Sequence, residues 1–121
     1  MKFQYKNARC VPYSYLNVTG ASKAKKDLLM KTLGTGLCDL RELCDPVAKV
    51  FKKELTPVDH DLDWLIEQKC GLYLAFDTIH CVGVDCEKRL IYDSSLPKCL
   101  KLCKEAFTFC DILKPEICVI V

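Results

Sequence analysis

Residues 97–113 read PKCLKLCKEAFTFCDIL, and this stretch carries the clearest pattern in the chain. Cys99, Cys103 and Cys110 fall on one face at helical spacing, with Phe107 beside them. A disulfide between positions i and i+4 of a regular helix is strained, because the two Cβ vectors run parallel. We therefore expect a helix over 97–113 whose cysteines form disulfides with other elements. This helix would then be the central element to which the others are linked.

The other cysteines extend this interpretation to the whole chain. Ten of the 121 residues are cysteine, an even number and a share typical of a disulfide scaffold. Because disulfides persist in oxidising compartments, we expect about five of them in a secreted, extracellular protein whose signal peptide has been removed. The disulfide candidates are Cys10, Cys38, Cys44, Cys70, Cys81, Cys86, Cys99, Cys103, Cys110 and Cys118.

Helical spacing and start signals recur along the rest of the chain. Ser22 is placed as a helix N-cap, and Pro46 and Pro57 are placed at the first position of further helices. The expected helices are 22–33, 38–44, 46–55, 57–78 and 97–113. Residues 81–86 are interpreted as a turn, and the β-branched tail 117–121 as an edge strand or a segment across the core. The predicted fold class is therefore all-α, a small disulfide-rich domain of four to five helices with room for a short strand or hairpin.

The length fits a single domain over 1–121, with 1–20 as an extended arm because this segment shows no helical period. The net charge of +2 lacks the basic excess that nucleic-acid binding requires. No apolar run approaches the roughly 18 residues of a membrane span. Asn17 begins an Asn-Val-Thr acceptor sequence for N-glycosylation, which supports the expected extracellular location.

Two of the expected helices define the predicted core and the predicted partner surface. Phe107 should be buried where the 97–113 helix packs against the 57–78 helix. The opposite face of the 97–113 helix carries a strip of lysines, and the single tryptophan lies off the main apolar stripe of the 57–78 helix. The candidate partner surface is Trp64, Lys98, Lys101 and Lys104.

Polar motifs give weak support for chemistry. The acidic cluster 59–63 begins like a calcium loop, but Trp64 and Cys70 stand where such a loop needs glycine and glutamate. His80 beside Cys81 could form a Cys–His pair for nucleophilic catalysis, but an oxidised Cys81 could not attack a substrate. The cysteine and histidine spacing also fits zinc poorly. We therefore expect no metal, no cofactor and no catalytic residue.

Three functions remain open on this basis. The leading expectation is a non-catalytic module that binds a protein or glycan partner, because a rigid scaffold presents a preformed surface and lowers the ordering cost of association. The first alternative is a carrier of a small apolar ligand or lipid in a helical cavity. The residues that could line this cavity are Leu62, Leu65, Ile66, Tyr73, Leu74, Phe76, Phe107 and Phe109. The second alternative is a secreted His-dependent hydrolase.

Overall fold

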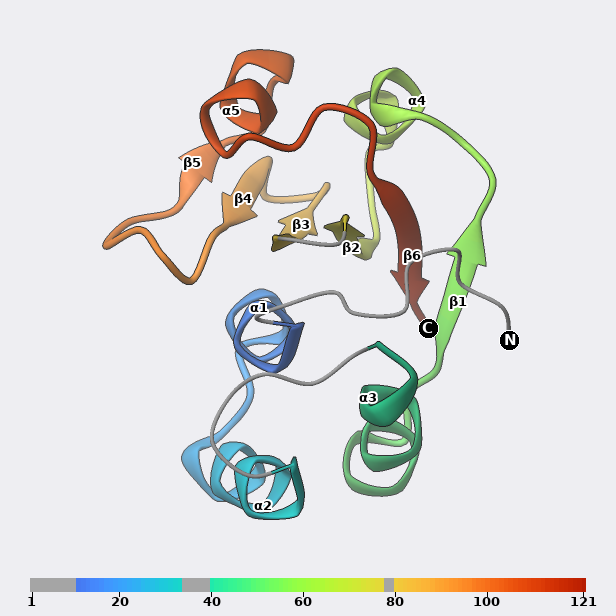
Figure 1. The fold of residues 1–121 in the computed structure, drawn as a ribbon, viewed down its shortest axis with the longest axis vertical. Coiled ribbons are helices and arrows are strands. Elements are labelled where there is room, and N and C mark those ends of the chain that lie inside the picture. Colours follow the sequence, from blue (N-terminus) through green and yellow to red (C-terminus); the bar gives the residue numbers. More distant parts are fainter. Residues whose placement is uncertain (1–10, 34–39, 78–79) are drawn as a thin grey trace.

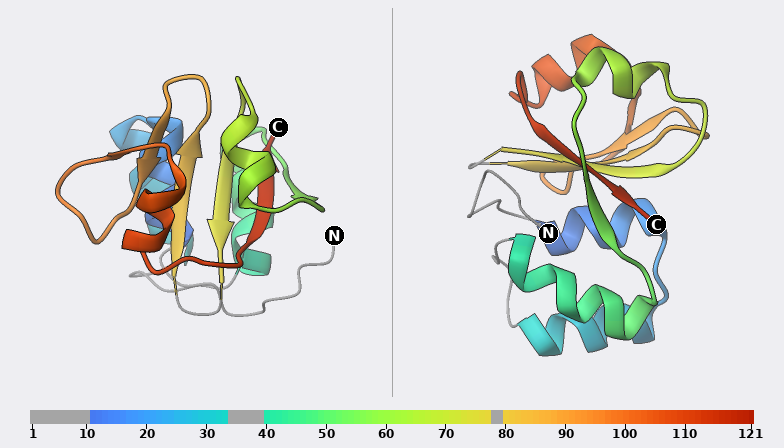
Figure 2. Two further views of the ribbon diagram at one scale, coloured as in Figure 1. Left: turned by 90° about the horizontal axis from the view of Figure 1, so that it is seen from above. Right: turned by 90° about the vertical axis from the view of Figure 1, so that its right-hand side faces the viewer.

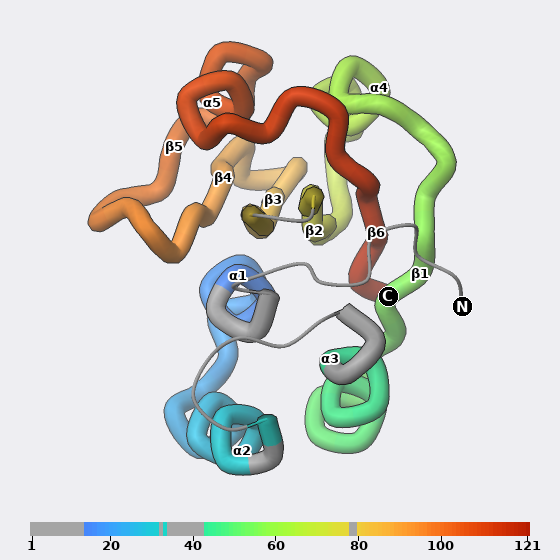
Figure 3. Tube along the Cα trace, in the orientation of Figure 1, coloured from blue at the N-terminus to red at the C-terminus, as the bar shows by residue number. Residues whose placement is uncertain are grey.

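The computed structural model describes residues 11–33, 40–77 and 80–121. Within these residues, six strands form one antiparallel sheet in the order β1-β6-β2-β3-β4-β5 (Figure 1). The strands are β1 (Leu55–Val58), β2 (Leu72–Phe76), β3 (Cys81–Asp85), β4 (Leu90–Tyr92), β5 (Leu100–Lys101) and β6 (Glu116–Ile120). The last strand runs between β1 and β2, and the chain ends beside β1 (Figure 3).

Helices cover both faces of this sheet. Figure 2 shows α4 and α5 on one face, α1 against the other face, and α2 and α3 beneath α1. The helices are α1 (Val11–Thr19), α2 (Lys23–Leu33), α3 (Leu40–Pro46), the π-helical turn η1 (Val47–Phe51), α4 (Leu62–Glu67) and α5 (Lys104–Phe109). Across the described ranges, no helix is both long and apolar enough to cross a membrane.

Two hydrophobic clusters hold the layers together, one on each face of the sheet. The first lies between the sheet and α1 to α3, and its largest members are Tyr15, Leu29, Leu43, Leu74 and Phe76. The second lies between the sheet and α4 and α5, and includes Leu65, Tyr73, Val82, Ile91 and Phe107. The central strands β2 and β3 are therefore covered on both faces.

The prediction of an all-α fold is wrong, and the 57–78 segment shows why. It contains the end of β1, the short helix α4 and the whole of β2. Strand β2 reads LYLAF, and almost all of it is buried. A strand covered on both faces has a continuous apolar run instead of an alternating one, and such a run cannot be told from a buried helix by periodicity. Gly71, with φ of +103°, turns the chain into this strand.

Four further expectations are corrected by the structure. The segment interpreted as a turn is β3, a fully buried strand. The expected helix over 97–113 is divided between β5 and the shorter helix α5. The expected arm over 1–20 includes helix α1, and the apolar tail is the inner strand β6. The helix expected over 22–33 is confirmed as α2, and the Ser22 Oγ accepts a hydrogen bond from the Lys25 amide at 3.4 Å.

The prediction of a disulfide scaffold is also wrong for the part of the chain that the structure describes, where no disulfide joins two cysteines. Cys81, which begins β3, and Cys86, which directly follows β3, would have been brought close together by the turn expected over 81–86. Five residue steps along the extended chain instead place their Cα atoms about 16 Å apart, and a disulfide allows about 7 Å at most. Buried cysteines here act as small apolar side chains in the two clusters. Cys10 and Cys38 lie outside the described residues.

Without these disulfides, the inference of an extracellular location loses the observation on which it rested. Asn17 is exposed on α1, and nothing in the structure supports its glycosylation. The predicted burial of Phe107 is confirmed, since its exposed fraction is 0%. Lys101 and Lys104 are exposed as expected, although they belong to a strand and a helix respectively and not to one helical face.

Candidate functional site

Helix α1 lies directly against the beginning of β3. The Ser14 hydroxyl, one turn into the helix, donates a hydrogen bond to the Cys81 carbonyl oxygen at 2.8 Å, and this bond is buried. At Gly83, an added Cβ would lie 2.6 Å from the Val18 Cβ and 2.8 Å from the Ser14 carbonyl oxygen. Only glycine allows so close an approach of a helix to a strand. The sequence thus fixes the first turns of α1 next to His80, the residue before β3.

His80 and Asp93 meet at one end of two neighbouring strands. His80 precedes β3 and Asp93 follows β4, and these strands pair antiparallel, so both residues lie at the same end of the pair. The Nε2 of His80 lies 2.7 Å from the Oδ2 of Asp93. The Asp93 side chain is 3% exposed, whereas the His80 side chain is 19% exposed. A buried carboxylate therefore holds an imidazole that solvent can reach.

Asp93 is held in place by the turn that it begins. Its Oδ1 accepts hydrogen bonds from the Ser95 hydroxyl at 2.7 Å and from the Ser95 amide at 2.9 Å. Burial alone would raise the pKa of Asp93, but the hydrogen bonds from Ser95 and His80 outweigh burial, and the pKa of Asp93 lies below its ordinary value. Asp93 is therefore ionised at neutral pH.

The ionised Asp93 decides how His80 can act. A carboxylate only accepts hydrogen bonds, so the Nε2 of His80 must carry a proton and donate it. In the neutral imidazole, Nδ1 then has a free lone pair, which is the arrangement of a general base oriented by a carboxylate. The backbone of His80 is fixed as well, since its amide donates to the Asp77 Oδ1 at 2.8 Å and its carbonyl accepts from the Asp77 amide at 3.0 Å.

Two described cysteines lie close to this pair, and neither is suited to act as a nucleophile with it. Cys110 lies beside Asp93, and burial, then the hydrogen bond to Asp93 and its negative charge, raise the pKa of the Cys110 thiol to about 12. A thiol with so high a pKa stays protonated at neutral pH and reacts slowly. Cys81 is fully buried in the cluster beneath the sheet. Because neighbouring residues of an extended chain point to opposite faces, it cannot face the same side as His80.

A surface pocket of about 390 Å³ opens beside the His80–Asp93 pair. Its lining residues are His80, Asp93, Ser95, Leu96, Phe109, Cys110 and Asp111. Phe109, the last residue of α5, is 70% exposed. The pocket thus combines a base, a buried carboxylate and an exposed aromatic ring.

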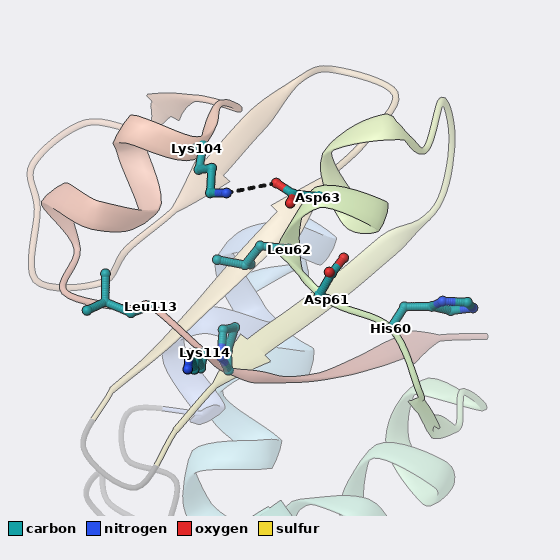
Figure 4. Close-up of a pocket in the computed structure, with 8 residues that line it drawn as sticks. His60, Asp61, Leu62, Asp63, Lys104, Leu113 and Lys114 are labelled. Atoms are coloured by element: carbon teal, nitrogen blue, oxygen red, sulfur yellow. Dashed lines mark ion pairs between the residues drawn. The ribbon is translucent and has the colours of Figure 1, made fainter.

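A second pocket of about 410 Å³ lies near His60, between α4 and the segment that follows α5 (Figure 4). Its only ion pair in the described residues joins the Lys104 Nζ to the Asp63 Oδ1 at 3.1 Å, with both side chains mostly exposed. Such exposed pairs contribute at most about 1 kcal/mol. His60 stacks on Trp64 with ring centroids 4.2 Å apart. Asp61 caps α4 by accepting a hydrogen bond from the Trp64 amide at 3.0 Å, so no carboxylate is shown orienting His60.

The structure brings together only part of what the sequence suggested. Trp64 and Lys104 lie on the adjacent helices α4 and α5, whereas Lys98 and Lys101 lie in the segment around β5. The residues expected to line one ligand cavity do not share one. Leu74 and Phe76 lie in the first cluster, Phe109 is exposed, and the others lie in or against the second cluster. Within the described ranges, no three His, Cys, Asp or Glu side chains are grouped so that they could hold a metal ion.

Sequence reasoning missed Asp93 and Ser95. His80 was considered only with its neighbour in the sequence, Cys81, which the strand turns away from it. The signal that could have found the pair is the two short apolar runs CVGVD and LIY, with His80 just before the first and Asp93 just after the second. If both runs are strands of one hairpin, these two residues must meet.

Comparison of the chain with protein-family models, with curated proteins and with solved structures gives no match. The functional interpretation is therefore based on the geometry of His80 and Asp93.

Proposed function

We propose that the protein is a hydrolase of acyl compounds in which His80 is the general base, Asp93 orients it and a water molecule is the nucleophile. The observation that carries this proposal is the 2.7 Å contact between the Nε2 of His80 and the buried carboxylate of Asp93. An imidazole oriented by a carboxylate is a general base that can take the proton of an attacking nucleophile, water included. Among the functions expected from the sequence, this geometry supports the His-dependent hydrolase.

The reaction follows from these roles. The Nδ1 of His80 takes a proton from a water molecule as the water oxygen attacks the substrate carbonyl carbon. When the tetrahedral intermediate collapses, the bond to the leaving group breaks and His80 returns the proton to that group. The acid and the leaving group then depart, and the imidazole is neutral again. Asp93 stays ionised throughout and stabilises the imidazolium.

The other two functions stay predictions. A non-catalytic binding module would use the exposed lysines and the Trp64 side chain, which is half-buried between His60 and Tyr73. A carrier would need one enclosed cavity, and the pockets described above open to solvent. Neither function explains why a buried carboxylate should hold a histidine that solvent can reach.

The proposal predicts that the protein hydrolyses p-nitrophenyl acetate and that Asp93→Asn lowers kcat/KM about tenfold or more, because the carboxylate that stabilises the His80 imidazolium is lost. Release of p-nitrophenol measures this rate. The matched control is Asp63→Asn, since the Asp63 side chain is mostly exposed and pairs with the exposed Lys104, and it should leave kcat/KM within about twofold of the unsubstituted protein. Equal rates for Asp93→Asn and the unsubstituted protein would rule out Asp93 as the partner of the base.

A further inference from the structure

One wall of the pocket beside His80 is the apolar side chain of Phe109, which is not packed into the hydrophobic core. Helix α5 buries Ala106 and Phe107 in the cluster above the sheet. Phe109, two residues further along, is turned away from that cluster by the helical period and is 70% exposed. A large aromatic ring left in water at a functional pocket is a common sign of a binding surface.

The opposite part of the wall is fixed by the turn that holds the carboxylate. The Leu96 amide donates a hydrogen bond to the Asp93 carbonyl oxygen at 3.0 Å, so the half-buried Leu96 side chain is positioned by the same turn as Asp93. On the other side, the chain leaves α5 through Asp111, whose φ of +61° sharply redirects the backbone. Leu96 and Phe109 thus line one pocket with His80, on two segments that are anchored independently.

The charges around the pocket also restrict what it can accept. Asp93 is ionised, and Asp111 is exposed at the pocket. These carboxylates would repel an acidic side chain, whereas an uncharged apolar group gains contact with Leu96 and Phe109 at no electrostatic cost. The volume of about 390 Å³ is large enough for one aromatic or branched aliphatic side chain.

We propose that Leu96 and Phe109 form a subsite that selects substrates with an aromatic or branched aliphatic side chain next to the carbonyl that the water activated by His80 attacks. This inference rests on the proposed hydrolase function and adds its substrate class, an ester or amide of an apolar amino acid. Such a subsite holds the side chain against Phe109 and thereby places the carbonyl carbon near the Nδ1 side of the imidazole.

The test compares two methyl esters that differ only in this side chain, N-acetylphenylalanine methyl ester and N-acetylglycine methyl ester. We expect the unsubstituted protein to prefer the phenylalanine ester, and Phe109→Ser to reduce the ratio of the two kcat/KM values about tenfold or more, because the ring contact is lost. Mass spectrometry of the released acids measures both rates. The matched control is Leu113→Ser, since Leu113 is 64% exposed but lines the pocket near His60 and should leave the ratio unchanged.

A binding measurement separates this inference from the proposed function. N-acetylphenylalaninol has the same side chain but no ester or amide at that carbon, and we expect it to shift the NMR signals of Leu96 and Phe109 in the unsubstituted protein and to bind Phe109→Ser about tenfold more weakly. Binding at this pocket without hydrolysis of either ester would support the subsite and contradict the hydrolase. Two results would overturn the subsite. One is a ratio of the two kcat/KM values that is the same in Phe109→Ser as in the unsubstituted protein, and the other is unchanged binding of the alcohol to that variant.

Discussion

Replacing His80 with alanine should lower kcat/KM for p-nitrophenyl acetate about a thousandfold, because the attacking water loses the base that takes its proton. The fold should survive this change, since the His80 side chain makes one hydrogen bond with a described residue and leaves the buried Asp93 with two hydrogen bonds from Ser95. Initial rates, together with a circular dichroism spectrum to verify folding, measure both expectations.

The chain supplies its own control for this experiment. It contains only two histidines, and His60 is exposed, stacked on Trp64 and not bonded to a carboxylate by any contact that the structure shows. His60→Ala should leave kcat/KM within about twofold of the unsubstituted protein. If His60→Ala and His80→Ala lowered the rate equally, the activity would be general imidazole catalysis and not the work of an oriented base.

Phe107→Ala should lower the free energy of unfolding by about 3–5 kcal/mol, because the ring is fully buried between α5 and the sheet and its removal leaves a cavity. That is a large share of the roughly 5–15 kcal/mol by which domains are stable. Urea unfolding followed by tryptophan fluorescence measures the change.

The neighbouring ring provides the comparison. Phe109 is 70% exposed on the same helix, so Phe109→Ala should change the free energy of unfolding by less than about 0.5 kcal/mol. Similar losses for both variants would show that the helix is oriented differently from the structure described above.

The sequence predicted local features well and the architecture badly, for identifiable reasons. The helix over 22–33 was predictable because it has a clear N-cap and lies at the surface, where periodicity is preserved. Strands β2 and β3 were not, because helices cover both of their faces and leave runs of apolar residues without alternation. The cysteine density suggested disulfides, but in the described part of the chain no two cysteines are joined, and several are buried in the two hydrophobic clusters.

The candidate site, too, could be predicted only in part from the sequence. His80 could be singled out from the sequence, because histidine is the side chain best suited to proton transfer near neutral pH. Its partner Asp93 could not, since thirteen residues and a hairpin separate the two. Only the antiparallel pairing of β3 with β4 brings them together, and that pairing depends on recognising both segments as strands.

The central claim is that Asp93 holds His80 as an oriented base, and the most direct measurement is an NMR spectrum that correlates the ring nitrogens of the two histidines with their ring protons. In the unsubstituted protein, the neutral His80 ring should carry its proton on Nε2 and leave Nδ1 unprotonated, because Nε2 donates to the Asp93 carboxylate at 2.7 Å. The exposed His60 ring, which stacks on Trp64, should exchange between both tautomers. A neutral His80 ring protonated on Nδ1, or one that exchanges between tautomers as His60 does, would contradict the account.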